Sequence, residues 1–208
     1  MGFYPLFVDL AGRRCLVVGG GVVAERRVAG LLAAGATVTV VAPTLTDGLR
    51  ALAATSRIYH EARTYAAGDV AGHELAFAAA DGPGVSEAVL AEGRREDVWV
   101  NAADDPEHCD FFLPAVVRRG ALTVAIGTGG LSPALTRAIR EELEAYFTDD
   151  YAALVELVAE VRGELRGLRR SPDGDTWVRA LGADLRRLLS EGRRDEAKQR
   201  LLEQLGAV

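Results

Sequence analysis

The sequence predicts an α/β protein: a doubly wound parallel sheet, then a strand–helix segment and a helical C-terminal domain. Three observations predict this arrangement. Near the N-terminus, a short apolar run leads into three glycines and then into a helical pattern. Short apolar segments then alternate with amphipathic ones as far as about residue 112, and Arg/Glu-rich helical sequence begins at residue 148. The first part is therefore expected to be Rossmann-like.

The first 43 residues contain a strand–helix–strand unit. RRCLVVGGG, residues 13–21, is a β-branched run that ends in glycine, which is typical of a strand entering a tight turn. VVAERRVAGLLAAG, residues 22–35, has helical spacing and ends in a glycine, and ATVTVVAP, residues 36–43, is a second apolar strand ended by proline. Because one helix joins the two strands, we expect a right-handed parallel crossover.

The same alternation continues more weakly. The expected helices are residues 45–55 and 85–96, and the expected strands are residues 57–62, 73–80 and 97–103. The strands are nearly continuous in apolar residues, as a parallel sheet covered on both faces requires. Residues 1–112 are therefore expected to form one domain.

Beyond this domain the pattern changes. PEHCDFFLPAVVRR, residues 106–119, has helical character, and ALTVAIGTGG, residues 121–130, reads as a strand that runs into glycines. SPALTRAIREELEAYF, residues 132–147, is a strong helix with Ser132 as its N-cap and Pro133 at the first helical position. Helical sequence then continues to the end, interrupted by RRSPDGDTW.

Composition limits the function classes. The 208 residues are 49% hydrophobic and carry a net charge of −6, so nucleic-acid binding has no support from bulk charge. No apolar run approaches the ~20 residues of a membrane span, and no signal peptide is visible, so we expect a cytoplasmic protein without membrane contact. The two cysteines lack the spacing of zinc or redox sites, and no metal ligand set is expected.

The glycine-rich turn predicts a dinucleotide site. Gly19, Gly21 and Ala24 match G-x-G-x-x-A between a strand and a helix, where the helix N-terminus faces a pyrophosphate. A purely structural glycine turn is the alternative. The acid expected ~20 residues on would fall near Ala42, but the sequence there is VVAPTLTDG, so Thr44 alone offers a ribose contact. No arginine follows to accept a 2′-phosphate, which favours NAD over NADP.

The run WVNAADDPEHCDFFLP contains one candidate catalytic acid. Asp105 is explained as the N-cap of a helix that starts at Pro106, and Asp110 as a solvated helix residue. Asp104 has no such explanation and lies at the carboxyl end of a strand, where doubly wound sheets bind ligands. It is either catalytic or a hydrogen-bond acceptor that stabilises the loop.

Residues 3–165 resemble the NAD-dependent precorrin-2 dehydrogenases of sirohaem synthesis. The blocks that carry the resemblance are YPLFVDL, CLVVGGGVVAERR, LAFAAADG, VNAADDPEHCDFFLPA and VAIGTGGLSPALTRAIREELE. The resemblance implies a dinucleotide-binding domain over residues 1–112, a dimerisation segment over 113–147 and a C-terminal helical domain over 148–208. It also implies a homodimer that binds a tetrapyrrole, and in some members the insertion of iron. The apolar stripe of the 132–147 helix supports the dimer, because a small unit could not easily hide it alone. Its members are Leu135, Ile139, Leu143, Tyr146 and Phe147.

The resemblance also assigns roles to residues. Asp104 falls on the family's catalytic aspartate and would take the proton while the nicotinamide takes a hydride. The implied cofactor contacts, besides the glycine-turn residues, are Val22, Val23, Pro43, Thr44, Ala80 and Asn101. A polycarboxylate substrate favours arginines in its cleft, although ordinary surface charge is the alternative. The candidate substrate contacts are Arg118, Arg119, Arg137, Arg140 and Thr128.

Two other functions fit part of the pattern. A non-catalytic NAD(H)-sensing module would explain the glycine turn but not the NAADDPEHCDFFLP and TGGLSPAL blocks. A metal chelatase without redox activity would not need an intact glycine turn. The sequence leaves open whether Fe²⁺ or Co²⁺ is also inserted.

Overall fold

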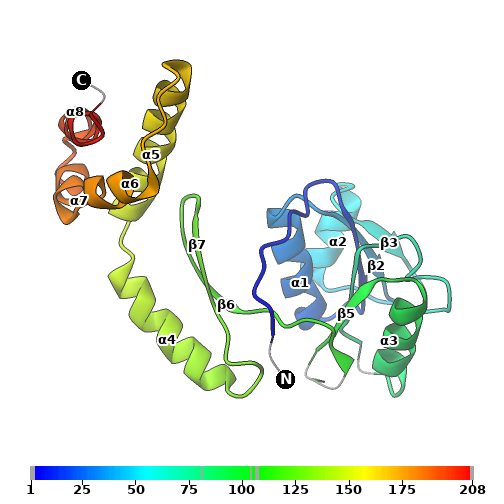
Figure 1. Cartoon of the computed structure of the whole chain (residues 1–208). Helices are drawn as coiled ribbons and strands as arrows, with labels where there is room; N and C mark the ends of the chain where they lie inside the picture. The colour runs from blue at the N-terminus through cyan, green and yellow to red at the C-terminus, as the bar shows by residue number, and fades with distance from the viewer. Residues whose placement is uncertain (1–2, 81, 104, 106–107, 207–208) are drawn as a thin grey trace. The chain divides into compact units, whose positions relative to one another are not determined.

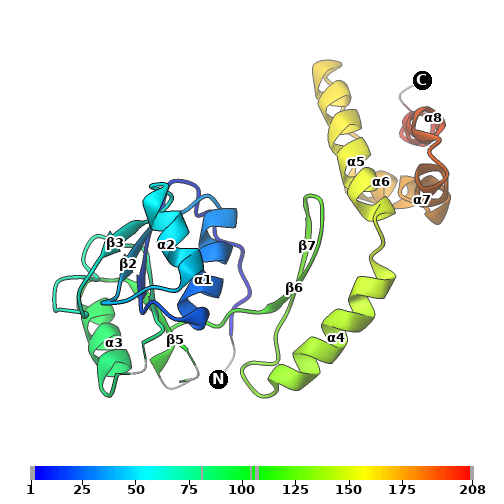
Figure 2. The same ribbon diagram turned by 180° about the vertical axis from the view of Figure 1, so that it is seen from behind.

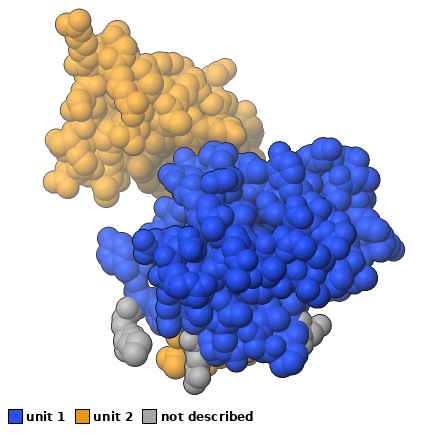
Figure 3. All heavy atoms as spheres, turned by 90° about the vertical axis from the view of Figure 1, so that its right-hand side faces the viewer, with its two compact units in different colours: residues 1–112 blue, residues 113–208 orange. Residues whose placement is uncertain are grey.

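The computed structural model describes residues 3–206 apart from residues 81, 104, 106 and 107. The chain divides into two compact units, Met1–Phe112 and Leu113–Val208, which are coloured separately in Figure 3. Each unit contains a hydrophobic core of its own. Of the helices in the described part of the chain, none is both long and apolar enough to cross a membrane.

Unit 1 is built on a five-stranded parallel sheet with the strand order β3-β2-β1-β4-β5 (Figure 1). The strands are β1 Arg14–Val18, β2 Thr37–Val41, β3 Tyr59–Glu61, β4 Leu75–Ala78 and β5 Trp99–Ala102. The chain winds outward from β1 to β3 and then returns to β4 on the other side of β1. The doubly wound prediction is confirmed, and the reversal between β1 and β4 creates the switch point at which such sheets bind ligands.

Helices cover both faces of this sheet (Figures 1 and 2). They are α1 Val22–Ala33 and α2 Asp47–Ala54 on one face and α3 Val85–Arg95 on the other. Successive side chains of β1 point to opposite faces, so Cys15 and Val17 pack beneath α1 and α2 while Leu16 and Val18 pack beneath α3. Each fully buried Val or Leu contributes ~1.5–3 kcal/mol, which explains why the strands are apolar without alternation.

Unit 2 begins with an antiparallel hairpin and continues as helices. The hairpin strands are β6 Ala115–Arg119 and β7 Leu122–Ile126, and the helices are α4 Pro133–Tyr146, α5 Asp150–Gly167, α6 Gly174–Ala180, α7 Ala183–Ser190 and α8 Arg194–Gln204. The side chain of Ser132 accepts a hydrogen bond from the Leu135 amide at 3.1 Å, which confirms its role as the α4 N-cap. Apolar residues of α5, α7 and α8 form a separate core.

Helix α4 differs from helix α5 in how far its side chains are buried. Among its described residues none is buried, and Leu135 and Tyr146 are 51% and 61% exposed. In α5, by contrast, Leu157 and Val161 are completely buried against α7 and α8. Within the described part of the chain, the predicted apolar stripe of α4 is therefore only partly covered: Ile139, Leu143 and Phe147 are half-buried, while Leu135 and Tyr146 stay exposed.

The helical prediction for residues 106–119 is wrong over its described part. Residues 115–119 form strand β6, and residues 109–114 are neither helix nor strand. The β-branched Val116 and Val117 pair with β7 in an antiparallel register, and Gly120 takes the positive φ of 55° needed to turn the chain back. Pairing with β7 thus overrides the local helical pattern.

Candidate functional site

The three glycines after β1 have different surroundings. Gly19 has a φ of 126°, and a Cβ there would collide with the carbonyl of Ala79 after β4. A Cβ on Gly20 would collide with the carbonyl of Thr44 after β2. Gly21, in contrast, has no atom of the described residues within 4 Å of the position of a Cβ, its two chain neighbours aside. Gly19 and Gly20 therefore let three strand ends pack together, and Gly21 leaves an open approach to the backbone.

Helix α1 starts directly at this opening. Its N-cap is Gly21, whose lack of a side chain leaves the first turn without a side-chain cap. Ala24 is completely buried, so the helix packs closely on the sheet, as the motif predicts. The uncapped amide groups and the helix dipole suit a phosphate group. The residues present therefore fit the pyrophosphate of a dinucleotide.

A pocket of about 570 Å³ lies over this turn. Its lining includes five of the predicted cofactor contacts, namely Gly19, Gly21, Pro43, Thr44 and Ala80. Val22, Val23, Ala24 and Asn101 are described but do not line it. The lining also includes residues that the sequence did not single out, namely Thr64, Tyr65, Gly82 and Val85. The signal for Thr64 and Tyr65 is their position directly beyond β3, at the same edge of the sheet.

The missing acid after β2 has a structural explanation. Ala42 is 2% exposed and belongs to the core beneath α1 and α2. Its carbonyl lies 2.9 Å from the Nε2 atom of His60, and the Thr46 amide donates to the Gly20 carbonyl at 2.9 Å. The loop after β2 is thus closed onto the glycine turn. A carboxylate at position 42 would be buried in this apolar core, which is costly.

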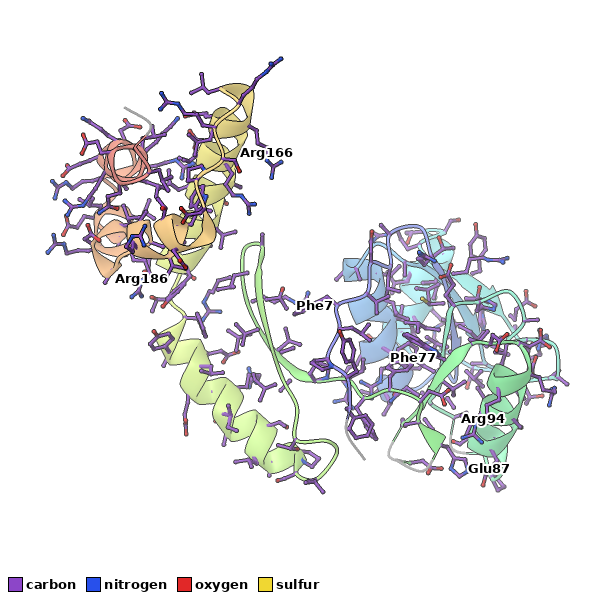
Figure 4. All side chains as sticks on the ribbon, viewed as in Figure 1. Phe7, Phe77, Glu87, Arg94, Arg166 and Arg186 are labelled. Atoms are coloured by element: carbon purple, nitrogen blue, oxygen red, sulfur yellow. The ribbon has the colours of Figure 1, made fainter. Side chains whose placement is uncertain are left out.

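At the other edge of the sheet, Asn101 holds the chain beyond β5. It is 5% exposed, and its Nδ2 atom donates to the Phe111 carbonyl at 2.9 Å and contacts the Cys109 sulfur at 3.4 Å. The Phe111 ring also packs edge-on against Phe77, which Figure 4 labels, with 5.5 Å between ring centroids. The side chain of Asn101 is therefore bonded to residues 109–111 and does not line the pocket.

The same segment corrects the interpretation of its acids. Asp110 is not a solvated helix residue, because its Oδ2 accepts from the Val100 amide at 2.9 Å and its own amide donates to the Val100 carbonyl at 2.8 Å. Asp105 lies 2.7 Å from His108 Nδ1, and the described residues that follow show no helix for it to cap beyond one turn at His108. The catalytic candidate Asp104 lies outside the described residues, as do Pro106 and Glu107.

The thiol of Cys109 completes this network. It donates toward the carbonyls of Ala102 and Asp105, each at 3.2 Å, and accepts from the Ala102 amide at 3.3 Å. Burial raises the pKa of this thiol, so it stays protonated near neutral pH. The described chain is thus held on both sides of position 104, by β5 before it and by the network of Asn101, Cys109 and Asp110 after it.

The candidate substrate residues lie in unit 2, and most have partners within it. Arg137 pairs with Glu141 at 3.0 Å, and Arg140 pairs with Glu144. Arg119 donates to the Glu144 carbonyl at 2.9 Å. The hydroxyl of Thr128 accepts from the Ser132 amide at 3.1 Å and so shapes the turn before α4. The side chain of Arg118 is exposed and forms no hydrogen bond or ion pair with the described residues. No group of His, Cys, Asp and Glu suited to a metal occurs in the described part of the chain.

Comparisons with known proteins agree with this geometry. A model of the family described as "Putative NAD(P)-binding" matches residues 6–115, more than half of the chain, and one described as "Sirohaem biosynthesis protein central" matches residues 119–146. A siroheme synthase of Methylococcus capsulatus is 36% identical over 210 residues, and one of Thioalkalivibrio sulfidiphilus is 38% identical over 205 residues. They align with 100% and 97% of this chain, but the chain spans only 44% and 42% of their lengths.

A solved structure supports the same relationship. The chain matches "SirC, precorrin-2 dehydrogenase" with a TM-score of 0.82 and 29% sequence identity, covering 97% of this chain and 100% of that one. The predicted resemblance and the predicted nicotinamide dinucleotide cofactor are thereby confirmed. The chain belongs to the putative NAD(P)-binding family, in the form in which the sirohaem biosynthesis central segment directly follows the dinucleotide domain.

Proposed function

We propose that this chain is an NAD-dependent precorrin-2 dehydrogenase that forms sirohydrochlorin for sirohaem synthesis. The observation that carries the proposal is the open Gly21 turn, which leads into an uncapped helix at the switch point of the sheet. The likeness to a precorrin-2 dehydrogenase along nearly the whole chain supports the substrate. The three-part division at residues 112 and 147 belongs to this proposal.

The reaction removes a hydride and a proton from the tetrapyrrole, and bound NAD supplies the hydride acceptor. The chain itself would bind the cofactor, orient the substrate and remove the proton. The backbone at Gly21 and the first turn of α1 would hold the pyrophosphate, and Thr44 would contact a ribose. Asp104 would accept the proton from the substrate carbon as general base.

The substrate carries carboxylates along its rim, which arginines recognise well. Arg118 is the best supported contact because its side chain has no partner among the described residues. Arg137 and Arg140 would have to exchange their partners Glu141 and Glu144 for substrate carboxylates. Arg119 and Thr128 are better suited to holding the hairpin and the α4 turn in shape.

A homodimer and a cytoplasmic location also belong to the proposal. The exposed apolar side chains of α4 support the dimer, since Leu135 and Tyr146 would be covered by a second copy. Sedimentation at micromolar concentration should give about twice the 22.1 kDa mass of one chain. A stable monomer would contradict the dimer without affecting the proposed reaction.

The purified chain should be mixed with enzymatically made precorrin-2 in four arms: with and without NAD, and with and without Fe²⁺. We expect the absorption spectrum of sirohydrochlorin to appear only when NAD is present. NAD binding without any spectral change would favour the sensing module. A chelatase without redox activity would leave precorrin-2 unchanged with NAD, and it would consume sirohydrochlorin that is added directly together with Fe²⁺, without forming NADH.

A further inference from the structure

Helix α3 carries a buried carboxylate that the proposed chemistry does not use. Glu92 is 2% exposed, and it lies between Glu87 and Arg94, which Figure 4 labels on this helix. It forms no ion pair with a described Arg, Lys or His. A carboxylate in this position destabilises the fold unless hydrogen bonds compensate for its lost hydration.

All of the described hydrogen bonds of the Glu92 carboxylate go to one segment, residues 65–70. Its Oε1 atom accepts from the Gly68 amide at 2.8 Å and from the Val70 amide at 3.2 Å. Its Oε2 atom accepts from the hydroxyl of Tyr65. These three hydrogen bonds thus connect the chain that follows β3 to helix α3, which follows β4. In the strand order, β3 and β4 lie on opposite sides of β1.

An ion pair also holds this part of the chain together. The guanidinium of Arg63 donates to both carboxylate oxygens of Asp69 at 2.7 Å, and Asp69 also accepts from the Ala66 amide at 2.8 Å. The bond to Arg63 lowers the pKa of Asp69, so the pair stays ionised at neutral pH. The segment is therefore held together by its own hydrogen bonds, and it is bonded to α3 through Glu92.

The start of this segment, Tyr65, and the preceding residue, Thr64, form one wall of the dinucleotide pocket. Thr64 and Tyr65 both line the pocket, on the side of β2 and β3. In doubly wound sheets this is the side of the adenosine half, where a carboxylate after β2 normally grips the ribose. Here that position is the buried Ala42. Burial and the bond to Glu92 raise the pKa of Tyr65, so its hydroxyl remains a donor.

We propose that Glu92 is a positioning residue for the adenosine half of the cofactor. By fixing residues 65–70 in advance, it holds Thr64 and Tyr65 as the wall that compensates for the missing carboxylate after β2. A wall that is ordered before binding removes an entropic cost from binding. The inference rests on the proposed NAD binding and adds a residue with no contact to the cofactor.

The test compares two replacements of the same residue. Glu92→Leu fills a similar volume but removes every acceptor from Gly68, Val70 and Tyr65. Glu92→Gln keeps a carbonyl oxygen for the two amides. Binding of NAD, AMP and nicotinamide mononucleotide should be measured by titration calorimetry. AMP and nicotinamide mononucleotide carry one phosphate each, so they separate the two halves of the cofactor.

We expect Glu92→Leu to lower the affinity for NAD and for AMP by about tenfold or more. The affinity for nicotinamide mononucleotide should fall by less than about threefold. Glu92→Gln should remain within about threefold of the wild type for all three ligands. Val89→Ala is the control for stability, because Val89 is a completely buried core residue of the same helix and has no hydrogen bond to residues 65–70. It should lower the melting temperature without changing NAD affinity.

Three results would overturn the inference. Unchanged NAD affinity in a folded Glu92→Leu variant would show that Thr64 and Tyr65 do not depend on the hydrogen bonds of Glu92. Equal weakening of both mononucleotides, or weakening by Val89→Ala of the same size, would show a general loss of structure. If Glu92→Leu does not fold, Tyr65→Ala takes its place, and unchanged AMP binding would then contradict the wall. A wild-type chain that binds neither NAD nor AMP would refute the proposed function and this inference with it.

Discussion

The two ends of the sheet's carboxyl edge are built by different means. At β1 and β2, backbone packs directly on backbone, because Gly19, Gly20 and Ala42 have little or no side chain. At β5, side chains hold the chain instead, through the hydrogen bonds of Asn101 and Asp110. The first arrangement leaves an open surface for a phosphate, and the second supports a loop that can carry an acid. We infer that binding and chemistry are divided between the two ends.

The largest expected effect tests the β5 end of the sheet, where we place the chemistry. Asp104→Ala should lower turnover by about 10²–10⁴-fold, because it removes the general base. NAD affinity and the melting temperature should stay close to those of the wild type, since the glycine turn is untouched. Turnover measured at saturating NAD decides this. Full activity of the variant would assign proton removal to water or to a substrate carboxylate.

The next effect tests the binding end. Gly21→Asp would place a carboxylate in the opening where the pyrophosphate approaches, and we expect NAD binding to become undetectable by calorimetry. The fold should persist, because apart from the two chain neighbours no described residue has an atom within 4 Å of the new Cβ position. A native circular dichroism spectrum is the control. Wild-type affinity in this variant would remove the glycine turn from the site.

A smaller effect concerns the support of the β5 end. Asn101→Leu leaves the Phe111 carbonyl without its donor, which should cost about 1–3 kcal/mol of unfolding free energy. Urea unfolding measures it. Turnover should fall while NAD affinity is kept, because Asn101 does not line the pocket. A loss of NAD affinity equal to that of turnover would break the proposed division.

The smallest effect concerns the neighbour of the catalytic candidate. Asp105→Ala removes a partly exposed contact to His108, for which we expect a cost of at most about 1 kcal/mol and nearly full activity. Thermal unfolding and turnover should be compared side by side with Asp104→Ala. An inactive Asp105→Ala together with an active Asp104→Ala would reverse our assignment of the two acids.

The comparison also shows which features a sequence reveals. The glycine turn and the apolar strands were predictable, because glycine spacing and buried runs reflect backbone geometry directly. The role of Asp110 and the strand at residues 115–119 were not, since each depends on a partner elsewhere in the chain, Val100 and β7 respectively. Thr64 and Tyr65 were also missed, because only the strand order brings the chain beyond β3 to the pocket.

The central claim is that this chain oxidises precorrin-2 with NAD bound at the glycine turn. The most direct measurement is an anaerobic single turnover that follows NADH and sirohydrochlorin together in the wild type and in Gly21→Asp. We predict that the wild type forms the two products at the same rate and in equal amounts, and that Gly21→Asp forms neither. Sirohydrochlorin without NADH in the wild type, or both products in Gly21→Asp, would contradict the account.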